Sequence, residues 1–131
     1  MADESNVTAK EAYEIADSFA QASARMLDFR IANSNVLSDE DASKLERCED
    51  TIDHLVVLFR GYGIQLIGAK AREAMVELQA AVDVARLTIE KINKTKKVIK
   101  IAGALVDLAV AVLAKDPKAI LGAAKKVKAA A

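Results

Sequence analysis

Residues 8–30 read TAKEAYEIADSFAQASARMLDFR, and this stretch decides the fold class. Apolar residues recur there every three or four positions for about five turns, which is the spacing of one face of an α-helix. Thr8 followed by Glu11 matches a capping box, so we expect the helix to begin at Thr8. The inward face is expected to hold Ala12, Ile15, Ala16, Phe19, Ala22, Ser23, Met26, Leu27 and Arg30.

The next helix is expected after the polar run 33–35, whose short side chains compete for backbone hydrogen bonds. Ser38 is its expected N-cap, with acids in the first turn where the helix dipole favours them. Its end has two candidates, Gly61–Gly63 and Gly68, and matched helix lengths favour Gly68. The expected inward residues are Leu45, Cys48, Ile52, Leu55, Phe59 and Leu66.

A third apolar stripe follows, and it leaves two alternatives for residues 69–114. The stripe predicts a helix through Ala71, Met75, Leu78, Val82, Ala85, Ile89 and Ile92. The polar run 93–97 favours a turn, but the same phase resumes at Ile99, Gly103, Val106, Val110 and Leu113. One long bent helix therefore stays open beside two helices.

Residues 98–114 form a segment that is apolar nearly all round, broken only by Lys100 and Asp107. Pro117 follows it, and proline disfavours helical geometry in the preceding residue while suiting the first turn of a new helix. A short last helix, 118 to about 128, is expected. The whole chain, 1–131, therefore predicts one all-α domain: a four- or five-helix, mostly antiparallel bundle with the apolar C-terminal helix in its core.

Composition limits the function classes. Aromatic residues make up 4% and tryptophan is absent, so stacking surfaces for bases or sugars are scarce. One cysteine, Cys48, excludes an internal disulfide, and its place on the apolar stripe predicts a core thiol. Asp50 and the single histidine, His54, lie one turn apart and are expected to form a surface pair. We find no catalytic, cofactor or metal site and expect a protein that is not an enzyme.

Charge is distributed unevenly although its sum is zero. Residues 1–54 hold 13 acidic and 5 basic residues, whereas 55–131 hold 6 acidic and 14 basic ones. An acidic half and a basic half suit partners of opposite charge. Nucleic acid is not expected as a partner, because the chain outside the lysine-rich C-terminal region is acidic. The candidate interaction surface comprises Asp39, Glu40, Glu46, Glu49, Asp53, Lys91, Lys94 and Lys97.

The apolar segment is a second candidate site, for a membrane or a partner. It is too short for a spanning helix, yet with residues 118–124 it makes a lysine-flanked hairpin suited to an anionic bilayer surface. In composition and order it resembles the buried hairpins of helical pore-forming toxins and colicin-type domains. Its candidate residues are Ile101, Leu105, Asp107, Leu108 and Val112.

The expected function is that of a non-enzymatic helical interaction protein that binds a protein partner or itself. The alternatives are a membrane-active, toxin-like subunit that stores residues 98–124 until it meets lipid, and a carrier of a small apolar ligand. The polar, acidic start of the chain lacks the layout of a secretory signal, so a cytoplasmic location is expected, with unconventional export left open.

Overall fold

The computed structural model describes residues 7–66 and 68–131 and is all-helical over these ranges. The first helix, α1 (Ala9–Ala32), begins as expected. The Thr8 hydroxyl accepts a hydrogen bond from the Glu11 amide at 3.1 Å, and the Glu11 carboxylate accepts one from the Thr8 amide at 3.0 Å. At the other end the Asn33 side chain donates to the Phe29 carbonyl. The predicted start and end of α1 are both confirmed.

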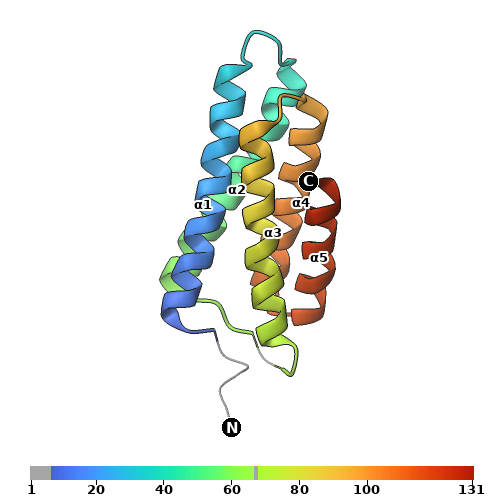
Figure 1. Cartoon of the computed structure of the whole chain (residues 1–131). Coiled ribbons are helices and arrows are strands. Elements are labelled where there is room, and N and C mark those ends of the chain that lie inside the picture. Colours follow the sequence, from blue (N-terminus) through green and yellow to red (C-terminus); the bar gives the residue numbers. More distant parts are fainter. Residues whose placement is uncertain (1–6, 67) are drawn as a thin grey trace.

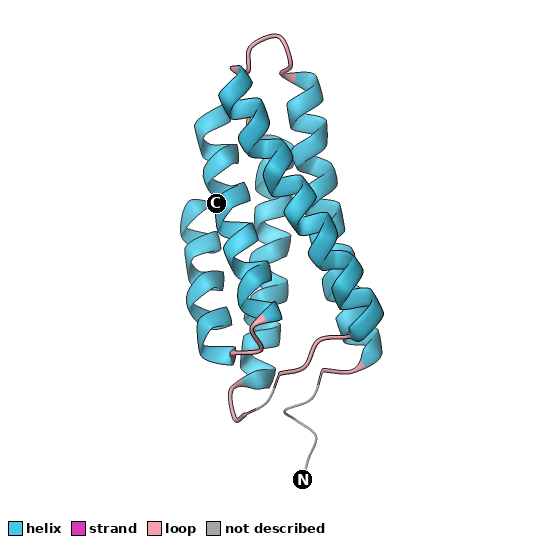
Figure 2. Cartoon of the chain, turned by 180° about the vertical axis from the view of Figure 1, so that it is seen from behind, coloured by secondary structure: helices cyan, strands magenta, loops and turns pink. Residues whose placement is uncertain are grey.

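Consecutive helices run in opposite directions along the bundle, as the sequence predicts (Figure 1). α2 is Asp39–Tyr62, α3 is Ala71–Lys91, α4 is Thr95–Leu113 and α5 is Pro117–Ala130. Helix α1 packs against α2 and α3, α4 packs against α2, and α5 packs against both α3 and α4. Because α3 packs beside α1, the loop after α2 crosses the end of the bundle to reach it. In the view from behind, α4 lies between α5 and α2 (Figure 2).

The end of α2 differs from the prediction. The helix stops at Tyr62, and Gly63 follows with φ 77°, a left-handed conformation that glycine adopts most easily. The favoured break at Gly68 is therefore wrong. Helix α2 has 24 residues, the same number as α1, so the criterion of matched helix length in fact favours a break at Gly63. Leu66 is buried as expected, but it belongs to the loop, where it and Ile64 close the end of the core.

Residues 69–114 form two helices, which settles the alternative left open by the sequence. Helix α3 ends at Lys91 and α4 starts at Thr95, three residues before the expected Val98. Pro117 is the first residue of α5, and the Asp116 carboxylate accepts a hydrogen bond from the Lys118 amide at 3.1 Å. The predicted turn and the predicted role of Pro117 are both confirmed.

Helix α4 buries a different face from the one expected. The predicted stripe turns outward in part: Val110 is 48% and Leu113 46% exposed, and Ile99, Gly103 and Val106 are only partly buried. The turn before α4 resets the helical phase, so the stripe of α3 does not continue into it, and the exposed side is the one that carries Lys100 and Asp107. The buried residues of α4 are Val98, Ile101, Ala102, Leu105, Leu108, Ala109, Ala111 and Val112. On α1, Leu27 is likewise exposed at 38%, contrary to expectation.

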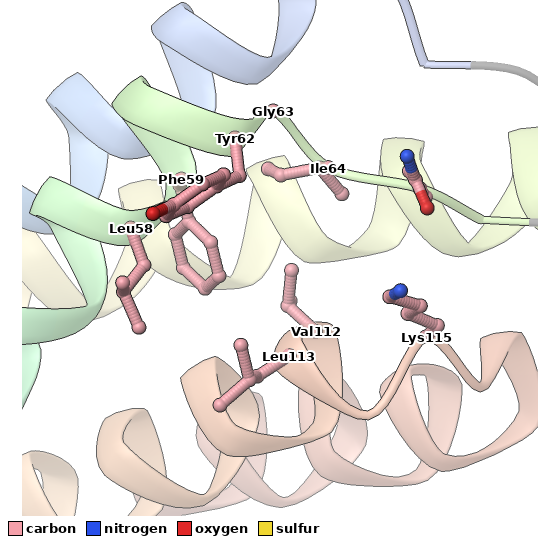
Figure 3. A pocket seen from close by; sticks show the side chains of 9 residues that line it. Leu58, Phe59, Tyr62, Gly63, Ile64, Val112, Leu113 and Lys115 are labelled. Carbon is pink, nitrogen blue, oxygen red and sulfur yellow. The ribbon is translucent and has the colours of Figure 1, made fainter.

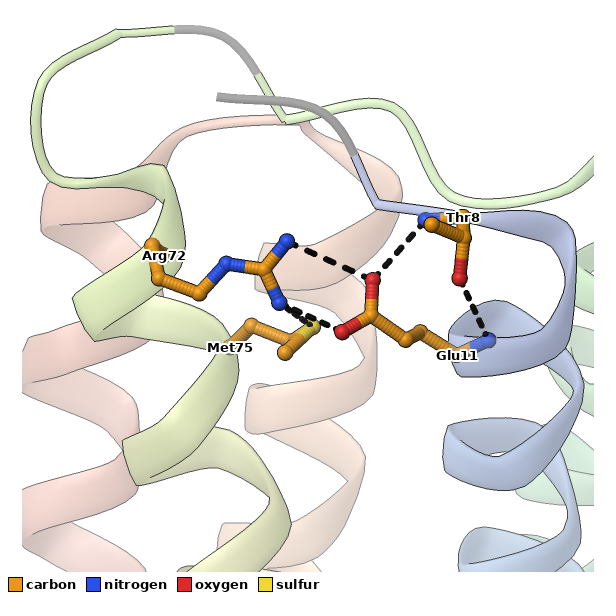
Figure 4. Close-up of polar contacts among 4 residues, drawn as sticks. All are labelled: Thr8, Glu11, Arg72 and Met75. Atoms are coloured by element: carbon orange, nitrogen blue, oxygen red, sulfur yellow. Dashed lines mark hydrogen bonds and ion pairs between the residues drawn. The ribbon is translucent and has the colours of Figure 1, made fainter. Parts of the chain in front are cut away.

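Ion pairs join α1 to both of its neighbours. Arg25–Glu90 and Asp17–Arg60 are partly exposed pairs at 3.5 Å, and two others are closer. Arg30 lies at the edge of the core because its guanidinium meets the buried Glu49 of α2 through two bonds of 2.8 and 2.9 Å. Near the start of α1, Glu11 binds Arg72 of α3, beside Met75 (Figure 4). The hydrogen bonds from Arg72 and Thr8 lower the pKa of Glu11 below its usual value.

Candidate interaction surface

The acidic candidates lie on α2, and four of the five face solvent. Asp39, Glu40, Glu46 and Asp53 are exposed, whereas Glu49 is 5% exposed and holds Arg30. Glu49 is therefore part of the α1–α2 packing and is not accessible to a partner. Its position was hard to foresee, because a carboxylate is buried only where a cation meets it, and that cation lies on another helix.

The basic candidates gather at the turn between α3 and α4. Lys91 and Lys94 are exposed and Lys97 is partly buried. Within 7–66 and 68–131, none of these three lysines forms an ion pair. Helix α4 starts here without a side-chain cap or an acid in its first turn. This turn is a lysine-rich, positively charged region.

The apolar candidates of the C-terminal segment lie inside the bundle. Ile101, Leu105 and Leu108 have no exposed surface and Val112 is 2% exposed, while Asp107 faces solvent. No helix in the described ranges combines the length and the apolar character needed to cross a bilayer. Contact with lipid through these four side chains would require α4 to leave its packing.

The solvent-facing side of α4 carries a glycine that the sequence analysis did not single out as a site residue. Gly103 lies in the middle of the helix, and a Cβ built there would meet nothing within 4 Å. Glycine in a helix interior costs about 0.5–1 kcal/mol relative to alanine. Among the described residues, no packing against this position requires that cost. Lys100 and Asp107, both exposed, flank Gly103 on the same side of the helix, with half-exposed Val110 one turn further on.

A pocket of about 380 Å³ lies where the C-terminal ends of α2 and α4 meet the loop after α2. Leu58, Phe59 and Tyr62 stand at one end of it and Lys115 at the other (Figure 3). Lys115 has φ 65°, the sole left-handed conformation of a non-glycine residue in the described chain. The pocket could not be predicted, because it depends on the loop leaving α2 at Gly63 and the favoured end of this helix was Gly68.

The single cysteine and the single histidine show no catalytic arrangement. Cys48 packs against the core but is only partly buried, so the predicted core thiol lies at the edge of the core. Burial raises the pKa of the Cys48 thiol, which reduces the reactive thiolate. His54 and Asp50 are both exposed. The described residues contain no group of three or more histidine, cysteine or carboxylate side chains placed to hold a metal.

Comparison with protein-family models, curated protein sequences and solved structures finds no match to this chain. No relative therefore supplies a function.

Proposed function

We propose that this chain is a non-enzymatic helical interaction protein and that a second copy of itself docks on the solvent-facing side of α4. The observation that carries the proposal is Gly103, a mid-helix glycine with open space above it. Glycine lets another backbone approach closely, and that benefit can offset its cost to the isolated helix. The docking face is defined as Lys100, Gly103, Asp107 and Val110.

The charges on either side of Gly103 favour a second copy as the occupant. Lys100 precedes it by three residues and Asp107 follows it by four, which is about 4.5 and 6 Å along the axis. In an antiparallel pair of α4 helices centred near Gly103, each Lys100 therefore meets Asp107 of the other copy. A twofold interface is self-complementary in this way, with each contact made twice.

The rest of the face is compatible with such a contact. Val110 adds apolar surface, and the long stem of a lysine can cover an apolar side chain while its ammonium stays in water. The face is small and partly charged, so we expect a reversible dimer of the kind whose interface buries less than about 1,200 Å². The acidic surface of α2 and the lysines at the α3–α4 turn remain free for steering other partners.

A charge-swap experiment tests the proposal. Lys100→Asp and Asp107→Lys should each weaken self-association at least about tenfold in sedimentation equilibrium, because each places like charges opposite one another. The double variant Lys100→Asp/Asp107→Lys should restore it. Failure of the double variant to recover would contradict the proposed pairing. A wild type that is still monomeric at about 1 mM would end the proposal, since even a millimolar complex would be substantially formed there.

A matched glycine provides the control. Gly122 of α5 is another helical glycine with nothing within 4 Å of a built Cβ, and it is exposed where Gly103 is partly buried. Gly103→Leu should abolish dimerisation by holding the two backbones apart, whereas Gly122→Leu should leave it unchanged. Equal behaviour of the two variants would mean that Gly103 has no special place in the contact.

The membrane-active alternative has less support. The apolar side chains that would enter a bilayer, Ile101, Leu105, Leu108 and Val112, form part of the core. Releasing them would expose the buried faces of α2, α3 and α5 as well. Flotation with anionic vesicles at neutral and acid pH is the direct comparison, and we expect the protein to stay in the unbound fraction.

A further inference from the structure

We infer that the pocket between the C-terminal ends of α2 and α4 binds a small, free amphiphile with a carboxylate head and a single hydrocarbon chain. This inference does not depend on the proposed dimer, because the pocket lies within one copy of the chain. It rests on the lining of the pocket, on its single charge and on the conformation of Lys115.

The apolar end of the pocket is preformed by the fold. Phe59 and Val112 are core residues, 3% and 2% exposed, and Ile64 of the loop is 5% exposed. Tyr62, by contrast, is 82% exposed although it belongs to the lining. A largely apolar hollow with few polar groups is the usual form of a small-molecule site. Its volume of about 380 Å³ corresponds to about a dozen water volumes, enough for a ligand of roughly ten heavy atoms.

Charge decides which head group fits. Lys115 is the one ionised side chain among the described lining residues, and Gln65 adds an amide. Figure 3 places Lys115 at the end away from Phe59 and Leu58, so a chain lying along the pocket brings its head group to the ammonium. The ammonium favours an anion over a neutral or cationic head of the same length.

The backbone at Lys115 gives an independent reason to look for a function there. Helices commonly end with a left-handed residue, and this residue is usually glycine because a side chain makes that conformation costly. Here the position just after Ala114 carries lysine with φ 65°. The Lys115 amide donates to the Val112 carbonyl at 3.0 Å, which fixes this turn. A residue that is unfavourable for the fold therefore supplies the charge of the pocket.

Octanoate, 1-octanol and octylammonium are suitable probes, since they share a chain and differ in head-group charge. We expect octanoate to shift the NMR signals of Tyr62, Ile64 and Leu113 and to bind about three- to tenfold more tightly than octanol. Octylammonium should bind most weakly. No shifts at these residues up to millimolar octanoate, or equal affinity for octanoate and octanol, would overturn the inference.

Variants of Lys115 separate binding from folding. Lys115→Gly should reduce octanoate affinity to that of octanol, leave octanol binding unchanged and raise the Tm, because it removes the charge and relieves the backbone together. Lys115→Arg should keep the preference for octanoate. Lys118→Gly, outside the pocket, is the matched control and should not alter the preference for octanoate. If Lys115→Gly retains the preference, the head group lies elsewhere and the assignment is wrong. Dilute monomeric protein keeps this test separate from self-association.

Discussion

Helices α1 and α4 differ in how firmly their sequences determine which face is buried. Helix α1 repeats its apolar residues every three or four positions with polar ones between them, which marks one side for burial, although Tyr13, Leu27 and Ile31 stay exposed. Helix α4 is apolar nearly all round and has a lysine and an acid as its only charged residues beyond its first turn. The core takes one side of it, and the surplus apolar surface remains outside at Val110 and Leu113. Surplus of this kind is available for contacts between molecules.

The largest expected effect distinguishes the two sides of α4. Leu105 has no exposed surface, and Leu105→Ala should lower the free energy of unfolding by about 2–5 kcal/mol through loss of burial and creation of a cavity. Val110→Ala, on the outer side, should change it by less than about 0.5 kcal/mol. Urea denaturation of dilute protein measures both. Comparable losses would show that the outer side also contributes to the core.

The ion pair that fixes α1 against α2 should give the next effect. Arg30→Ala leaves the carboxylate of Glu49 buried without its cation, and we expect a loss of about 2 kcal/mol in unfolding free energy, given that Arg30 is 25% exposed. Lys44→Ala, at an exposed pair with Glu40 within α2, is the control and should cost much less. If both variants lose the same unfolding free energy, the burial of Glu49 adds nothing to the cost of removing its cation.

Substitution of Gly103 should raise the stability of the monomer, whereas most substitutions on α4 should lower it. Gly103→Ala and Gly122→Ala should each stabilise the monomer by about 0.5–1 kcal/mol, since alanine is the better helix former and has room at both positions. Thermal unfolding of dilute protein provides the measurement. A Gly103→Ala variant that is less stable than wild type would reveal an intramolecular need for the glycine.

The smallest effect concerns Glu11 and its dependence on pH. Because the folded protein lowers the pKa of Glu11, its ionisation adds stability above the unfolded pKa, and this contribution disappears as pH falls through the folded pKa. Glu11→Gln should therefore cost about 0.5 kcal/mol at pH 7, and the difference from wild type should shrink below about pH 4. A difference that stays constant down to pH 2 would exclude the ionised pair as its source.

Periodicity and capping residues were enough to predict the all-helical fold and several helix ends, whereas the number of helices stayed at four or five. Thr8, Ser38 and Pro117 act through neighbours in sequence, so their roles can be read locally. The burial of Glu49 and the pocket beside Lys115 depend on which helices become neighbours, which local patterns do not encode. The buried face of α4 was predicted wrongly because the stripe of α3 was continued across the turn, although Lys100 and Asp107, seven residues apart on one side, mark the outward side.

Cross-linking through position 103 tests the central claim most directly. In a Cys48→Ala background, Gly103→Cys places one thiol near the proposed twofold axis, opposite its own copy, and Gly122→Cys places one on α5. Mild oxidation of protein at associating concentration should convert the Gly103→Cys variant rapidly to a disulfide-linked dimer, while the Gly122→Cys variant forms it only slowly. Equal, slow rates for the two variants would contradict the account of α4 as the contact surface.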